Sequence, residues 1–205
     1  GSYWFVMRNV MNKWTWTKTS FTGLMQLIVA VALSLAVVLP ASANPRDQAK
    51  RIHDRLAGVP PTDAVLDSME ALLPGNPQAA AEIAMNDVSF YNVTLKNFAA
   101  PWTNRDQSVF VPLNDYIATF IGMVRDDVPF NTLLSADLAY VGANGVVAAA
   151  PSPSNNTHYE QLEANNINLR DNLVPVAQSS INGLPSTATA GVMTSRAASE
   201  AFFIA

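Results

Sequence analysis

The sequence predicts a mainly α-helical protein: a single N-terminal transmembrane or signal helix, then one extracytoplasmic helical domain with a loop-rich C-terminal third. Three observations lead to this prediction. Residues 21–39 form an apolar run without a charged side chain. Beyond that run, apolar residues recur every three or four positions in several segments, which is the spacing of an amphipathic helix. Proline, glycine and asparagine stand where those segments begin and end.

Residues 1–20 carry only positive charge, because all 16 acidic residues of the chain lie beyond residue 43. Basic residues mark the cytoplasmic side of a membrane-spanning helix, and tryptophan is enriched at the boundary between membrane and water. We therefore expect residues 1–20 to be cytoplasmic or interfacial, with the bulk of the chain in the periplasm. The expected interface anchors are Trp14, Trp16, Lys13 and Lys18.

The apolar segment can be interpreted as a retained membrane helix or as a cleaved signal. It approaches the roughly 20 residues that cross a bilayer core and exceeds the about 7–15 of a signal core. However, Ala41 and Ala43 form the small-x-small pattern of a signal cleavage site. We adopt a transmembrane helix or uncleaved signal over residues 21–43, and cleavage after Ala43 stays the alternative. The expected membrane-anchoring residues are Phe21, Leu24, Leu27, Ile28, Val31, Leu35 and Val38.

Composition excludes several classes of function. The net charge is −4, and the exported part is more acidic still, which argues against nucleic-acid binding. The chain has no cysteine, so disulfides, thiolate metal sites, iron–sulfur clusters and covalently attached c-type haem are all excluded within it. Charged residues make up only 14%. A surface of small and uncharged residues suits a protein partly covered by other subunits, and it equally suits many ordinary exported bacterial proteins.

Residues 44–141 are predicted to be a helical domain. Asn76-Pro77 is a strong start signal, because asparagine caps a helix and proline favours its first turn. Thr62 is expected to cap the helix that comes before this one in the chain, over residues 62–73. Pro74-Gly75 are expected to end that helix. The expected helices cover residues 46–57, 62–73, 77–98, 112–127 and 131–138.

Residues 142–205 are predicted to be loop-rich with a terminal helix. Asn144-Gly145 predicts a turn, and the Pro-Ser-Asn segment 151–156 predicts an exposed loop. Thr194 or Ser195 is the expected cap of the last helix.

The side chains that could carry chemistry are few. His53, beside Asp54, is interpreted as a surface histidine, and His158 as a loop residue, because a metal site needs further ligands at fitting spacing. Asp126-Asp127 is interpreted as a helix-end charge cluster, since neighbours on a helix point in different directions. We expect no catalytic, cofactor-binding or metal-ligating residue, no cofactor, and no enzymatic activity.

Aromatic residues offer one alternative to the interpretation that the chain has no binding site. Phe90, Tyr91 and Phe98, together with Trp102, could line a ligand groove. Core packing is the default for such large apolar side chains, and it is what we expect.

Three short stretches together resemble a known family. They are residues 51–61 (RIHDRLAGVPP), 127–137 (DVPFNTLLSAD) and 190–194 (AGVMT). In this order they are similar to turns of the helical domains of planctomycete-type exported proteins associated with c-type cytochromes. The haem motif of that family, Cys-x-x-Cys-His, has no counterpart here, so no haem ligand is carried over. The resemblance implies an electron-transfer neighbourhood.

These observations lead us to expect a membrane-anchored periplasmic accessory or scaffold subunit. It would dock on a larger membrane complex, with an electron-transfer complex of photosynthesis or respiration as the candidate. Its partners would be other subunits, including a c-type cytochrome, and the lipid bilayer. Two alternatives remain open: the N-terminal part of an exported cytochrome-containing oxidoreductase, and a free periplasmic binding protein released by signal cleavage.

Overall fold

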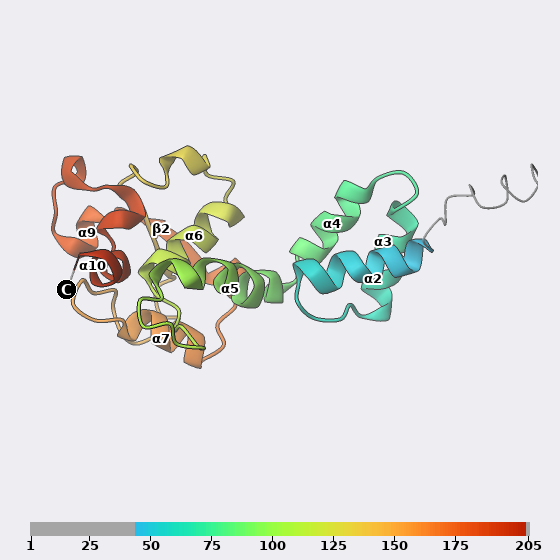
Figure 1. The fold of residues 1–205 in the computed structure, drawn as a ribbon, viewed down its shortest axis with the longest axis horizontal. Coiled ribbons are helices and arrows are strands. Elements are labelled where there is room, and N and C mark those ends of the chain that lie inside the picture. Colours follow the sequence, from blue (N-terminus) through green and yellow to red (C-terminus); the bar gives the residue numbers. More distant parts are fainter. Residues whose placement is uncertain (1–43, 204–205) are drawn as a thin grey trace, which may run out of the picture. The chain divides into compact units, whose positions relative to one another are not determined.

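The computed structural model describes residues 44–203 of the chain, and residues 44–205 form a compact unit of their own. The expected membrane anchor, interface anchors and cleavage site all lie outside the described residues. Within 44–203 no helix is both long enough and apolar enough to span a bilayer. The described part is mainly helical, as the sequence predicts (Figure 1).

Three helices open the described chain: α2 (Pro45–Leu56), α3 (Asp63–Leu72) and α4 (Pro77–Met85). The side-chain oxygens of Asn44, Thr62 and Asn76 each accept a backbone N–H in the first turn of the helix that follows. Such caps satisfy donors that have no partner inside the helix. The predicted caps at Thr62 and Asn76 are therefore confirmed.

These three helices share a small core of their own. It consists mostly of alanine and leucine side chains with Met69, which is fully buried. On the surface, the Arg46 guanidinium on α2 contacts the carboxylates of Asp67 and Glu70 on α3, at 2.5 and 2.9 Å. Both carboxylates are solvent-exposed or partly so, and exposed ion pairs contribute about 0–1 kcal/mol. The apolar contacts therefore hold this group together.

The sequence predicts one continuous helix over 77–98, but this prediction is wrong. α4 ends at Met85, and separate helical turns follow. Chain geometry changes at Asn86-Asp87, where the Asp87 carboxylate accepts the backbone N–H of Ser89 and starts a new turn. Side chains of this type compete with the helix for backbone bonds. A π-helical turn (Phe90–Leu95) follows, then α5 (Lys96–Ala99) and a 3₁₀ turn (Ala100–Thr103).

The π-helical turn directs Asn92 onto a distant segment. Its Nδ2 donates to the carbonyl of Ile167 at 2.9 Å, and its Oδ1 accepts the N–H of Leu169 at 3.0 Å. A single amide thereby satisfies two backbone groups about 75 residues away in sequence. π-helical turns are rare and occur frequently at functional sites. Here the turn places Asn92 against the backbone of residues 167–169.

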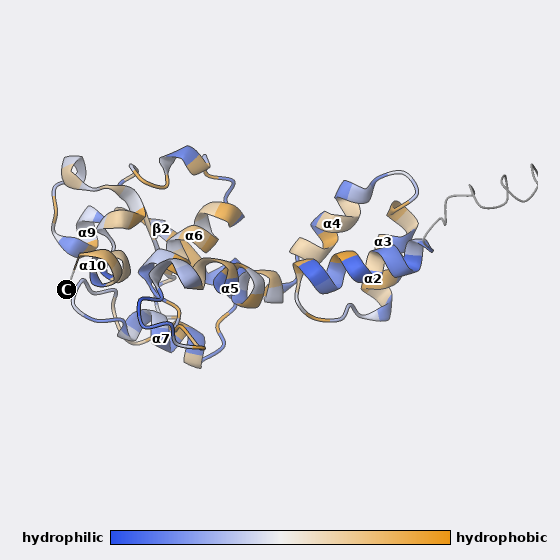
Figure 2. Cartoon of the chain, viewed as in Figure 1, coloured by the Kyte–Doolittle hydropathy of each residue, from blue (hydrophilic) through white to orange (hydrophobic). Residues whose placement is uncertain are grey.

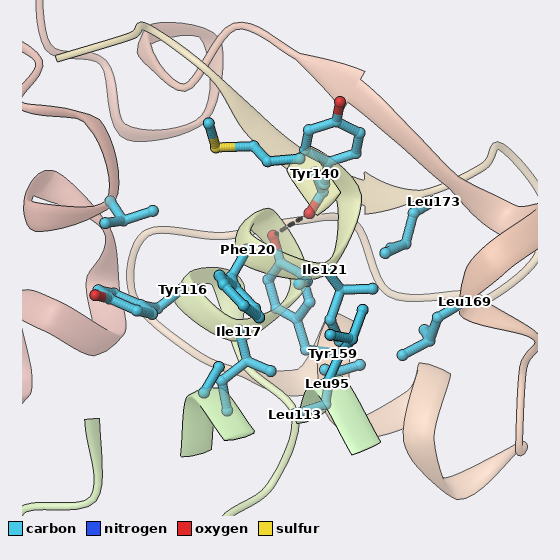
Figure 3. Close-up of a cluster of buried hydrophobic side chains, with 14 of the residues drawn as sticks. Leu95, Leu113, Tyr116, Ile117, Phe120, Ile121, Tyr140, Tyr159, Leu169 and Leu173 are labelled. Atoms are coloured by element: carbon cyan, nitrogen blue, oxygen red, sulfur yellow. Dashed lines mark hydrogen bonds between the residues drawn. The ribbon is translucent and has the colours of Figure 1, made fainter. Parts of the chain in front are cut away.

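Helix α6 (Asp115–Arg125) is the centre of the larger core. It is buried along Tyr116 to Met123, and Figure 2 shows it coloured apolar along most of its length. A helix that is apolar on most faces belongs in an interior. Asn114 caps it, and the helix begins at Asp115, three residues after the predicted start at Pro112. Figure 3 shows its side chains Tyr116, Ile117, Phe120 and Ile121 among residues from several other elements.

A two-stranded antiparallel ribbon, which the sequence analysis did not predict, lies against α6. It is formed by β1 (Ala139–Gly142) and β2 (Leu173–Val176), with Tyr140 opposite Pro175. β1 follows directly on the segment that was expected to be helical over 131–138. Instead of that helix, a short 3₁₀ turn (Phe130–Thr132) and further turns lead into the strand.

The C-terminal third contains more regular structure than its composition predicts. It holds α7 (Thr157–Ala164), α8 (Leu169–Asn172), α9 (Ser179–Asn182), a 3₁₀ turn (Ser186–Ala188), a second one (Gly191–Thr194) and α10 (Arg196–Phe202). Ser195 caps α10 through a bond from the N–H of Ala198 to its Oγ, which confirms one of the two predicted caps.

Two of the three stretches that carry the family resemblance pack directly on each other. The N–H of Val192 donates to the carbonyl of Leu133 at 2.9 Å. Between them, Gly191 has φ +54° and leaves no room: a Cβ there would lie 1.9 Å from the Leu133 oxygen. Only glycine fits this contact, because it tolerates positive φ and brings no side chain.

We predict that Gly191→Ala lowers the free energy of unfolding by about 3 kcal/mol or more, since positive-φ strain and overpacking add. Gly145→Ala is the matched control. Gly145 also has positive φ, but a Cβ there meets nothing within 4 Å. The control should lose only about 1–2 kcal/mol. Urea unfolding followed by circular dichroism measures both, and equal losses would contradict the close contact.

Candidate functional site

No metal centre can be assembled from the part of the chain that the structure describes. No group of three or more His, Asp or Glu side chains that could hold an ion occurs among residues 44–203. The ionisable residues singled out by the sequence must therefore be judged from their own contacts.

His53 is buried in the structure, so its interpretation as a surface histidine is wrong. Its Nδ1 lies 2.9 Å from the carbonyl of Val59, in the turn that follows α2. Its Nε2 lies 3.7 Å from the Asp87 carboxylate. The ring ties the end of α2 to the turn at Val59, and the periodicity of α2 could not show this because the partner comes from outside the helix.

His158 is also buried, on α7 and not in a loop as the sequence suggested. Its Nδ1 lies 2.7 Å from the carbonyl of Ala149, and its Nε2 accepts the N–H of Gly142 at 2.9 Å. A ring that bonds to a carbonyl on one side and an N–H on the other is a neutral imidazole with its proton on Nδ1. Both nitrogens are occupied by backbone, so the ring acts as a structural link.

Asp126 ends α6, in agreement with the predicted helix-end charge cluster. Its carboxylate accepts from the Arg125 guanidinium at 2.6 and 2.8 Å and from the Tyr140 hydroxyl at 2.7 Å. These hydrogen bonds, that from Arg125 first, lower the pKa of Asp126. Arg125 also donates to the carbonyl of Leu173 at the start of β2. The cluster thus fastens α6 to both strands.

Asp115 is the most buried carboxylate among these groups. It accepts the N–H groups of Arg196 and Ala197 at the start of α10, at 2.6 and 3.0 Å, and the N–H of Tyr116 at 2.9 Å. Burial raises its pKa, while these backbone bonds oppose the rise. With three N–H donors already bound, this carboxylate positions α10 rather than offering a base to a substrate.

The aromatic residues give the clearest exposed feature. Phe120 on α6 is buried and contacts the rings of three neighbours, with centroids 5.8 Å away at Phe98, 5.2 Å at Trp102 and 5.7 Å at Phe130. Phe98 and Phe130 are 61% and 49% exposed. We call these four residues the aromatic surface.

Core packing is thus confirmed for Phe90 and Tyr91, which are buried, but Phe98 presents most of its ring to solvent. Leu134, one turn beyond Phe130, is 59% exposed. Sequence analysis missed Phe120 and Phe130 as members of this surface. The Pro129-Phe130 pair could have indicated it, since a phenylalanine at the start of a tight turn has little room to bury its ring.

Tyr159 on α7 is buried in the larger core and makes a hydrogen bond whose contribution to stability can be tested. Its hydroxyl donates to the Tyr140 carbonyl (Figure 3), which lies on the outer edge of β1, away from β2. Burial, and to a smaller extent Asp115, raises the pKa of Tyr159. At alkaline pH the native state therefore keeps this phenol protonated, whereas the unfolded chain loses the proton.

We predict that Tyr159→Phe costs about 1–3 kcal/mol at neutral pH, because a buried carbonyl loses its donor. Above about pH 10 the wild type loses stability as its unfolded phenol ionises. Phenylalanine has no such loss, so the gap between the two proteins should narrow between about pH 9 and about pH 11. Urea unfolding across this range measures it, and a constant or widening gap would contradict the raised pKa.

No protein-family model, curated protein or solved structure matches this chain.

Proposed function

We propose that this chain is a non-catalytic accessory subunit of a larger membrane complex, docking on a protein partner through the aromatic surface. The observation that carries the proposal is the exposure of Phe98 and Phe130 on either side of the buried Phe120. Aromatic side chains are enriched at the centres of protein interfaces, where a few of them supply most of the binding energy.

The state of the ionisable groups supports a binding role over catalysis. His158 and Asp115 bind backbone groups through both nitrogens or both oxygens, and Asp126 is paired with Arg125 and Tyr140. A general acid or base needs a free atom within reach of a substrate. The atoms of these three residues are instead already hydrogen-bonded within the protein.

The N-terminal segment supports the same role. An apolar helix over residues 21–43 would hold the domain beside its complex, and such a tether raises the effective concentration of a weak docking surface. A partner face of apolar and aromatic residues, burying about 1,000 Å² or more in total, would then suffice for stable association. The resemblance to cytochrome-associated domains makes a c-type cytochrome subunit the proposed neighbour.

We expect the double variant Phe98→Asp/Phe130→Asp to separate the chain from its complex. In membranes gently solubilised from the native host, the wild type should migrate with the complex on a native gel and carry haem absorbance with it. The double variant should migrate alone, since each charge would be buried without a partner.

Phe110→Asp is the matched control. Phe110 is 89% exposed and lies outside the aromatic surface, so this variant should still migrate with the complex. A wild-type chain recovered alone and water-soluble would overturn the accessory-subunit proposal. Association without haem absorbance would overturn only the choice of a cytochrome as neighbour.

A further inference from the structure

The chain contains two Asn-Gly pairs, Asn144-Gly145 and Asn182-Gly183. An asparagine that precedes a glycine is chemically labile, because glycine has no side chain to hinder attack of its backbone nitrogen on the asparagine amide. The glycine nitrogen must lose its proton and reach the asparagine Cγ for this attack to occur. Whether a given pair reacts therefore depends on how the fold holds that N–H group and that side chain.

Asn144-Gly145 forms an exposed turn after β1. The N–H of Val146 donates to the carbonyl of Ala143 at 3.1 Å, which places Asn144 and Gly145 at the central positions of the turn. Neither the Asn144 side chain nor the Gly145 N–H makes a hydrogen bond with any described part of the chain. A Cβ at Gly145 would meet nothing within 4 Å, so the space around the attacking nitrogen is open.

Asn182-Gly183 is held differently, at the end of α9. The N–H of Gly183 donates to the carbonyl of Ser179 at 3.1 Å, so the attacking nitrogen is bound within a helical turn. The Asn182 side chain is fixed as well, since its Oδ1 accepts the N–H of Leu184 at 2.9 Å and its Nδ2 is buried. Attack would have to break both hydrogen bonds and release ammonia from a buried position. The fold therefore protects this second pair.

We propose that Asn144 is a site of spontaneous modification, at which the folded protein converts the side-chain amide to a carboxylate while Asn182 stays intact. The Gly145 nitrogen loses its proton to water and bonds to the Asn144 Cγ. The Nδ2 group takes up a proton and leaves as ammonia, and a cyclic succinimide remains. Water then opens the ring: cleavage between the Gly145 nitrogen and Cγ gives aspartate, and cleavage between that nitrogen and the main-chain carbonyl carbon gives isoaspartate.

The fold tolerates this change. The N–H of Ala143 donates to the carbonyl of Asn172 at 2.7 Å, and the ring of His158 holds Gly142. Both hydrogen bonds precede Asn144 in the chain and use none of its atoms. Conversion adds a negative charge to an exposed turn, so the modified protein should stay folded and become more acidic. The inference is independent of the docking role, because it uses none of the residues of the aromatic surface.

The test incubates the full chain in detergent at neutral and at mildly alkaline pH, in water labelled with heavy oxygen. Each conversion takes an oxygen atom from water, so the label marks conversions that occur during incubation. Digestion in ordinary water and tandem mass spectrometry locate them, and electron-based fragmentation separates isoaspartate from aspartate. Because attack at Asn182 must first break two hydrogen bonds, Asn144 should convert about tenfold faster or more. Its conversion should be faster at the higher pH and should yield isoaspartate.

Unfolding supplies the matched control. In guanidinium chloride both pairs lose their hydrogen bonds, so Asn182 should convert at a rate similar to that of Asn144. In the folded chain, Gly145→Ala places a methyl group beside the attacking nitrogen, so it should slow conversion of Asn144 about tenfold and leave Asn182 unaltered.

Circular dichroism shows whether the variant folds, and if it does not, the comparison of folded and unfolded wild type decides alone. Equal conversion of the two asparagines in the folded chain, or no conversion of Asn144 there, would overturn the proposal. A folded Gly145→Ala variant that converts as fast as the wild type would also overturn it.

Discussion

The outer edge of β1 is the constraint on which the larger core depends. A two-stranded ribbon leaves backbone groups without strand partners, and buried groups of this kind must be satisfied elsewhere. Thr119 on α6 accepts the N–H of Tyr140, Tyr159 donates to its carbonyl, and His158 accepts the N–H of Gly142. Three side chains from two helices thus replace a third strand. Both helices must therefore lie at hydrogen-bonding distance from β1.

This close approach determines which residues can stand on α6. A Cβ at Gly122 would lie 2.1 Å from the ring of Tyr140, so glycine is required where the helix meets the strand. Once α6 is placed, Asp115 at its first turn fixes the start of α10, and Phe120 fixes the aromatic surface. The aromatic surface is thus a consequence of where one buried helix lies.

The sequence predicted those features, such as helix caps, that depend only on residues close by in the chain. Asn76-Pro77 and Ser195 start helices as expected, because a cap needs only the N–H groups of the next turn. The ribbon could not be predicted in this way, since Tyr140 and Pro175 meet only in three dimensions. The burial of His53 and His158 was missed for the same reason: their partners are backbone groups outside their own helices. Of the aromatic surface, only Phe98 and Trp102 were singled out from the sequence, and core packing was expected for both.

The distribution of occupied polar groups and exposed apolar area favours the proposed docking role over a catalytic one. The buried ionisable residues His158 and Asp115 are occupied by backbone groups. The exposed rings of Phe98 and Phe130, by contrast, leave apolar area that another molecule can cover. Apolar area is satisfied by another protein, because only a large contact removes enough of it from water.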